Sequence, residues 1–150
     1  MNIIETLSID RIIENLIYIH PLLSKSLTHS IRVKTNLNPG SLYILGLLGK
    51  YEMLSMSEIG CKLSMPKPHV TAQVDRLISE EMVERLFDPN DRRIINIRMT
   101  EKGQVDFKAI KQEVSLDMRK RIEKLNSEKL NQLFESTRQV RDILSEIMVD

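Results

Sequence analysis

The sequence is poor in several residue types whose presence would have pointed to a function. It has one cysteine, no tryptophan and only 4% aromatic residues. Cys61 alone cannot form an internal disulfide or a cysteine-rich zinc site, and a single cysteine suits a reducing cytosol. So few aromatic residues argue against an all-β sandwich and against a platform on which nucleic-acid bases stack.

An excess of charge of one sign and a long apolar run are also missing. The 22 basic and 21 acidic residues leave a formal net charge of +1, so composition favours neither nucleic acid nor membrane as a partner. No run reaches the roughly 18 apolar residues of a membrane span. Residues 1–5 lack the basic start and apolar stretch of a signal peptide. We therefore expect a cytoplasmic protein that makes no membrane contact.

Motifs of the common enzyme classes are absent too. The sequence has no Gly-rich phosphate loop, no His-Glu-x-x-His and no Gly-x-Ser-x-Gly. Its three histidines, His20, His29 and His69, lie too far apart along the chain to predict a local metal cluster. We expect neither an enzyme nor a metal or cofactor site.

What the sequence does contain is helical periodicity, in a chain whose 150 residues favour a single domain. Apolar residues recur at spacings of three and four from about residue 9 to residue 33, and Pro21 should kink that helix or break it near His20. Asn38, followed by Pro39, predicts the start of a second helix. The first helix carries Ile9, Ile12, Ile13, Leu16, Ile17, Leu23, Leu27 and Ile31 on its apolar face.

The remaining elements follow from capping and turn residues. Met53 and Leu54 suggest a very short strand, and Ser55 with Glu58 matches a capping box before a short helix. Further helices are expected over about 67–81, 101–125 and from about 126 onward. The last helix carries an apolar stripe of Leu130, Leu133, Phe134, Val140, Leu144 and Ile147.

A two-stranded ribbon is predicted between Met82 and Thr100. Its turn is Asp88-Pro89-Asn90-Asp91, in which proline presets φ and the acidic and amide side chains bond their own backbone. Asp91 precedes Arg93 by two residues, so its carboxylate can accept from the guanidinium and hold it in one orientation. An arginine on a narrow ribbon fits the DNA minor groove, where the potential is most negative.

Two helices joined by a tight break and followed by a hairpin form a winged helix-turn-helix, whose second helix enters the major groove. With Val70, Val74, Leu77 and Ile78 turned inward, a mostly polar face is left for DNA. The residues expected to contact DNA are Lys67, Pro68, His69, Thr71, Ala72, Gln73 and Arg76 in the helix, and Asp91, Arg92 and Arg93 in the wing.

Residues 56–103, "MSEIGCKLSMPKPHVTAQVDRLISEEMVERLFDPNDRRIINIRMTEKG", resemble the MarR family of bacterial regulators. The segment Val74-Asp75-Arg76-Leu77 matches the end of the family's recognition helix. Asp91, Arg93 and Met99-Thr100 match its wing signature of Asp, any residue, Arg, then Leu-Thr. The resemblance extends over nearly the whole chain.

The resemblance implies a mainly α fold with a small β-hairpin wing and a dimer built from the terminal helices. The expected organisation is a single MarR-like domain over residues 1–150. Its winged lobe covers about 38–100, and dimerisation helices cover about 1–35 and 101–150. The implied function is a homodimeric repressor that binds double-stranded DNA at a pseudo-palindromic operator. Release by a small-molecule effector stays open.

Several positions depart from the family pattern or allow another reading. Pro66, Pro68, His69 and Ala72 replace common family residues, which affects the expected base preference, and Ser41 replaces a frequent glutamine without expected harm. Two alternatives stay open. One is a winged-helix module that binds protein. The other is a thiol-based sensor at Cys61, for which a packed structural cysteine is the default reading.

Overall fold

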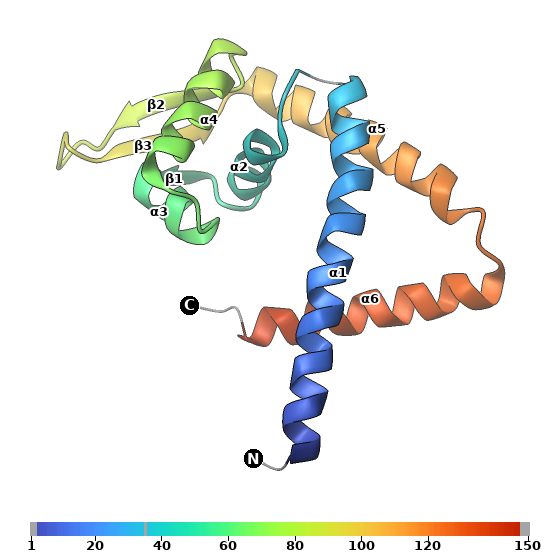
Figure 1. Ribbon diagram of the computed structural model, residues 1–150. Coiled ribbons are helices and arrows are strands. Elements are labelled where there is room, and N and C mark those ends of the chain that lie inside the picture. The colour runs from blue at the N-terminus through green and yellow to red at the C-terminus, as the bar shows by residue number, and fades with distance from the viewer. Residues whose placement is uncertain (1–2, 35, 148–150) are drawn as a thin grey trace. The chain divides into compact units, whose positions relative to one another are not determined.

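The computed structural model describes residues 3–34 and 36–147 (Figure 1). Residues 1, 2, 35 and 148–150, which belong to the ranges expected to form dimerisation helices, lie outside the described residues, as does the side chain of Leu27. The described elements are α1 (Ile3–Lys34), α2 (Pro39–Lys50), β1 (Met53–Ser55), α3 (Met56–Lys62), α4 (Lys67–Ser79), β2 (Val83–Phe87), β3 (Ile95–Met99), α5 (Glu101–Ile122) and α6 (Ser127–Ile147). This is the predicted mainly α fold with a small β wing.

The predicted helix starts are confirmed by their capping bonds. Asn38 Oδ1 accepts from the Ser41 backbone N–H at 2.9 Å, with Pro39 in the first turn of α2. Ser55 and Glu58 form the full capping box of α3, with bonds of 3.2 Å to the Glu58 N–H and 2.7 Å from the Ser55 N–H. These caps satisfy N–H groups that have no partner inside the helix.

The β-sheet is larger than the sequence predicted. The ribbon of β2 and β3 was expected, but β1 also joins β3, so the strand order is β1-β3-β2 and both pairs are antiparallel. Ile97 pairs with Leu54 on one side and Arg85 on the other. In Figure 1 the β2–β3 ribbon extends past α4 to an open tip, the wing.

The hydrophobic core lies in the winged lobe, between α2, α3, α4 and the sheet. Its largest fully buried apolar side chains are Ile44, Leu45, Ile59, Val70, Val74, Leu77 and Ile97. The predicted inward face of α4 is therefore confirmed for three positions, whereas Ile78 is only half buried. Because this core fixes α4 against the sheet, it also fixes the exposed face of α4 relative to the wing.

Gly103 allows α5 to start directly beneath the sheet. A Cβ on this residue would lie 2.0 Å from the Met82 carbonyl oxygen, so only glycine fits without a shift of the backbone. Thr100 caps the helix, since its Oγ1 accepts from the Gly103 N–H at 2.9 Å and donates to the Glu81 carbonyl oxygen at 2.7 Å. The Thr-x-x-Gly sequence thus joins α5 to the end of the wing.

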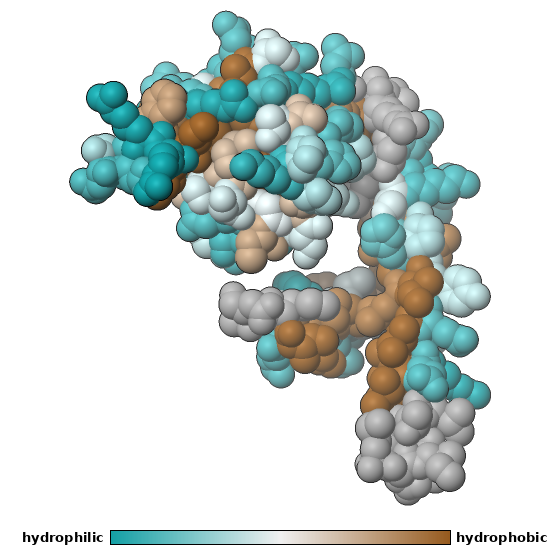
Figure 2. All heavy atoms as spheres, turned by 60° about the vertical axis from the view of Figure 1, so that its left-hand side comes forward, coloured by the Kyte–Doolittle hydropathy of each residue, from teal (hydrophilic) through white to brown (hydrophobic). Residues whose placement is uncertain are grey.

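At Pro21, where a kink or a break was expected, the helix does not break. Helix α1 runs without interruption from Ile3 to Lys34 and contains Pro21 within it. Much of its apolar face is exposed, and Figure 2 shows brown side chains gathered along this helix. The large exposed apolar residues are Ile9, Ile12, Ile13, Ile17, Tyr18, Ile19, Leu22 and Leu23.

The chain divides into two compact units, Met1–Val114 and Ser115–Asp150. The first holds the winged lobe and α1, and the second holds the end of α5 and all of α6. Helix α6 has no buried residue, although Leu133, Phe134, Val140, Ile143 and Ile147 are apolar. None of the described helices is long and apolar enough to cross a membrane.

Candidate nucleic-acid interface

A tight turn presents the first residues of α4 at the surface. After α3, Ser64 takes a left-handed conformation with φ of 48°, and the Met65 N–H donates to the Gly60 carbonyl oxygen at 2.9 Å. Pro66 then occupies the N-cap position with extended backbone, and Pro68 stands in the first turn. Proline suits this position because its missing N–H would have no helical partner there.

The exposed face of α4 holds most of the residues predicted to contact DNA. Lys67, Pro68, His69, Ala72 and Arg76 are all exposed, and Thr71 is half buried. The Thr71 hydroxyl donates to the Lys67 carbonyl oxygen at 3.0 Å, so its proton is used within the helix. Its methyl group and oxygen lone pairs remain for a partner.

Arg76 has a partner within the winged lobe. Its Nη2 donates to the backbone carbonyl oxygen of Asn36, in the segment between α1 and α2. This contact ties the recognition helix to the start of the winged lobe. The remaining guanidinium donors can still reach a phosphate.

Gln73 does not lie on the flank of the exposed face, where the sequence placed it. It is buried, with 7% of its surface exposed, and its Oε1 accepts from the fully buried Ser41 Oγ at 2.9 Å. The Gln73 side chain also lies where a Cβ on Gly40 would approach it within 3.3 Å. Ser41 is therefore a contact between α2 and α4, a role that sequence reasoning missed.

At the wing tip, Asp91 holds Arg93 as predicted. Arg93 Nε and Nη2 donate to the two Asp91 carboxylate oxygens, each at 3.0 Å, and the Arg93 backbone N–H also donates to Oδ1 at 3.0 Å. The guanidinium bonds lower the pKa of Asp91 below its usual value, with a further contribution from the backbone bond, and the carboxylate raises the pKa of Arg93. Both charges therefore persist at neutral pH.

The turn leaves this arginine in solvent. Asp88 Oδ1 accepts from the backbone N–H groups of Asn90 at 2.9 Å and Asp91 at 3.1 Å, which is the predicted self-bonding of the turn. The Arg93 side chain is 90% exposed, against 35% for that of Asp91. Arg92 is exposed as well. The acid thus lies behind the arginine and directs it outward.

A further ion pair joins the wing to the recognition helix. Arg85 Nη2 on β2 lies 2.6 Å from Asp75 Oδ1 on α4. On the other side of the sheet, Arg98 pairs with Glu84 across β2 and β3 at 2.7 Å. Only the fold brings Asp75 and Arg85 together, because they lie ten positions apart in different elements.

Cys61 is exposed, so the default reading of a packed cysteine is wrong. It lies in α3, the helix that precedes α4 in the sequence. Among the residues that the structure describes, no group of three or more His, Cys, Asp or Glu side chains is arranged to hold a metal ion.

These features define a winged helix-turn-helix: a short α3, a tight turn, an exposed α4 and a ribbon with a directed arginine. The MarR family model matches residues 37–95, which cover this lobe up to the start of β3. Together with the relatives below, the match shows that the winged lobe of this chain is similar to the MarR family.

Three relatives illustrate the likeness. The transcriptional repressor MdtR of Bacillus subtilis is 30% identical over 77 residues, which are 51% of this chain and 50% of MdtR. A MepR-like protein complexed with pseudoligands is 26% identical, with a TM-score of 0.59, over 91% of this chain and 95% of the other. A mutant MarR from E. coli complexed with operator DNA is 20% identical, with a TM-score of 0.66, over 93% and 99%. The matched segment spans only half the length of MdtR.

Proposed function

We propose that the protein is a dimeric transcriptional regulator that binds duplex DNA, acts as a repressor and has no enzymatic activity. The observation that carries this proposal is the arrangement at the wing tip. The two oxygens of the Asp91 carboxylate accept from Nε and Nη2, one edge of the Arg93 guanidinium, and the Arg93 side chain is 90% exposed on a narrow ribbon beside an exposed helix. Such a cation is oriented before it meets its partner, so less side-chain freedom is lost on binding.

The pair of exposed elements matches the two grooves of B-DNA. The start of α4 offers Lys67 and His69 for base edges or phosphates in the major groove, while Arg93 reaches the minor groove. The names of relatives support the same reading, since one is a repressor and another is complexed with operator DNA. A protein that binds an operator needs access to the chromosome, so we place this protein in the cytoplasm.

The dimer is inferred from two apolar helix faces. On α6, the residues Leu130, Leu133, Thr137, Val140, Leu144 and Ile147 repeat at alternating spacings of three and four, the pattern of a helix–helix seam. The Thr137 hydroxyl donates to the Leu133 carbonyl oxygen at 2.7 Å, so it brings no unmet donor to such a seam. Exposed apolar residues on α1 add a second surface that a partner protomer would cover.

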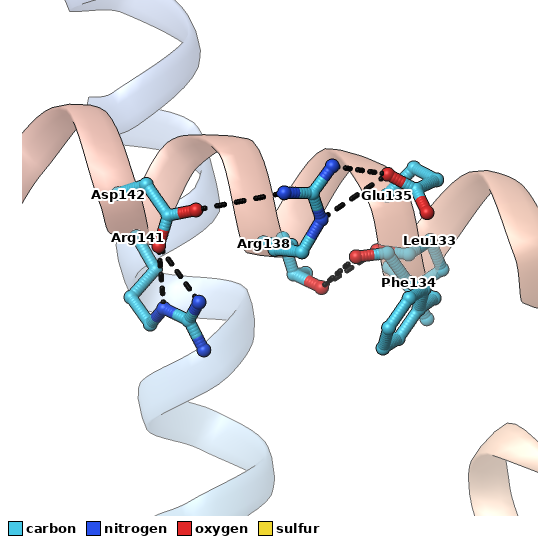
Figure 3. Close-up of polar contacts among 7 residues, drawn as sticks. Leu133, Phe134, Glu135, Arg138, Arg141 and Asp142 are labelled. Carbon is cyan, nitrogen blue, oxygen red and sulfur yellow. Dashed lines mark hydrogen bonds and ion pairs between the residues drawn. The ribbon is translucent and has the colours of Figure 1, made fainter.

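Charged residues on α6 bond within the helix (Figure 3). Arg138 contacts Glu135 at 2.8 Å and Asp142 at 3.8 Å, and Arg141 contacts Asp142 at 2.7 Å. These charged side chains pair with one another and lie outside the apolar repeat. The helix is therefore amphipathic, as a dimerisation helix needs to be.

Charge placed on this seam tests the dimer. We expect Leu133→Glu with Val140→Glu to give monomers or insoluble protein, because two carboxylates per helix would be buried between protomers. The matched control is Gln132→Glu with Gln139→Glu, which adds the same charges at neighbouring exposed positions. Sedimentation velocity gives the size of each. A double seam variant that remains a dimer of unchanged size would contradict the assignment.

DNA binding itself is tested by gel shift and footprinting on the DNA upstream of its own gene. A two-fold dimer should protect a pseudo-palindrome whose half-sites lie about 10 base pairs apart. Protection of one asymmetric half-site, or no binding to any duplex, would overturn the proposal in favour of a protein-binding module.

A small-molecule effector is a separate inference. The MepR-like relative carries pseudoligands, and we infer that a small-molecule effector also acts here. The gel shift repeated with candidate ligands tests this inference.

A further inference from the structure

The wing carries a large apolar side chain that is not buried in the hydrophobic core. Phe87, the last residue of β2, is 68% exposed, although most large apolar side chains of the winged lobe are buried. Ile94 is 42% exposed and follows Arg93 directly. Phe87 and Ile94 thus flank the tip Asp88–Arg93, and the Asp88 N–H donates to the Ile94 carbonyl oxygen at 3.1 Å to close the loop.

The strand register shows on which side of the sheet Phe87 lies. Side chains alternate along a strand, so Phe87 shares a side with Arg85, two residues earlier. Arg85 reaches Asp75 on α4, which makes this the side of the recognition helix. Glu84, one residue before Arg85, points to the opposite side and pairs with Arg98.

Phe87 therefore continues the proposed DNA interface. It lies on the α4 side of the ribbon, at the base of the loop that holds Arg93 in solvent. A duplex that received both the helix and the arginine would pass over this ring. Proteins that bind the minor groove combine arginine contacts with apolar side chains such as phenylalanine, which they frequently insert between base steps.

We propose that Phe87 is a minor-groove contact, packing its ring on deoxyribose and base edges beside the site of Arg93. This inference rests on the proposed DNA-binding function and adds a contact that salt does not screen. Arginine supplies the attraction that depends on counterion release, whereas the ring supplies burial of apolar surface. The two contributions can be separated by varying the salt concentration.

The test compares three variants of the full-length protein on the footprinted duplex at 50–200 mM salt. Phe87→Ala should weaken binding by about five- to thirtyfold, the effect of losing partial burial of a phenylalanine in each protomer, and should leave the salt slope unchanged. Phe87→Leu should lose less than half of the binding free energy that Phe87→Ala loses. Met53→Ala is the matched control, because Met53 is exposed on the same sheet but pairs with Arg98 on the opposite side.

Each outcome bears on a different proposal. The inference would be overturned if Phe87→Ala bound DNA with wild-type affinity while its far-ultraviolet circular dichroism spectrum and melting temperature matched those of the wild type. Phe87 would then be a candidate contact for a protein partner. A lowered salt slope for Phe87→Ala would also overturn it, since the ring would then act only by placing Arg93. Should Phe87→Ala not fold, Phe87→Leu decides in the same way. Failure of the wild type to bind DNA would instead refute the proposed function.

Discussion

Replacing Arg93 by alanine should change both the affinity for DNA and its dependence on salt. Each cation placed against the DNA backbone releases about 0.9 counterion, so a dimer that loses two arginines should lower its salt slope by about 1.8. Between 50 and 200 mM salt, a fourfold range, that slope corresponds to a factor of about twelve. The ratio of the DNA affinity of the wild type to that of Arg93→Ala should therefore fall about twelvefold over this range.

Asp91 separates two explanations of why an acid stands at the tip of a DNA-binding ribbon. If it orients Arg93 through the two bonds of 3.0 Å, then Asp91→Ala should weaken binding mildly, in the direction of Arg93→Ala. If it acted only by repelling phosphate, the same change would tighten binding. Because the guanidinium lowers the Asp91 pKa, the carboxylate stays charged at neutral pH and loses its effect only as pH falls through that lowered value.

The assay is a fluorescence-anisotropy titration of labelled duplexes, matched and scrambled, at several salt concentrations. Arg93→Ala should weaken binding to both duplexes alike, because a backbone or minor-groove cation carries little base information. Arg138→Ala, which removes an arginine from α6, is the control for loss of charge alone. Tighter binding by Asp91→Ala would refute the orienting role, and an unchanged salt slope for Arg93→Ala would remove Arg93 from the interface.

Two further predictions concern the scaffold behind the interface, both measured as free energies of unfolding in urea. Gly103→Ala should destabilise the protein by about 1–3 kcal/mol, because the new Cβ would meet the Met82 carbonyl oxygen at 2.0 Å; a gain from better helix propensity alone would contradict this. Ser41→Ala should cost about 1–3 kcal/mol by leaving buried Gln73 without its donor, whereas Ser41→Ala with Gln73→Met should be nearly neutral. Equal losses in the single and double variants would show that the bond contributes nothing.

Local signals made much of this fold predictable. Asn38, Ser55 and Thr100 each bond a backbone N–H three residues ahead, and such caps are visible in sequence because donor and acceptor lie within one turn. The same holds for the tip of the wing, where Asp91 and Arg93 are two residues apart. For these four contacts, in which both partners belong to one short segment, residue types and spacing were sufficient.

Contacts between elements were not predictable in this way. The pairing of β1 with β3 and the ion pair of Asp75 with Arg85 depend on how distant segments meet in space. The continuity of α1 through Pro21 was also not decided by local rules, which predict either a kink or a break there. A proline removes one backbone donor and crowds the preceding turn, but the turns on either side of Pro21 keep a single helix.

The burial of Gln73 changes where base discrimination should be sought. Its amide was expected on the flank of the major-groove face, but it is enclosed and bonded to Ser41, so it holds α2 and α4 together instead. The Thr71 proton is used within the helix, and Arg76 is partly engaged by the Asn36 carbonyl oxygen. Under the proposed function, we expect direct reading of bases to rest mainly on the start of α4, at Lys67 and His69. We expect further selectivity to come from the shape of the minor groove, into which we propose that the exposed Arg93 of the wing inserts.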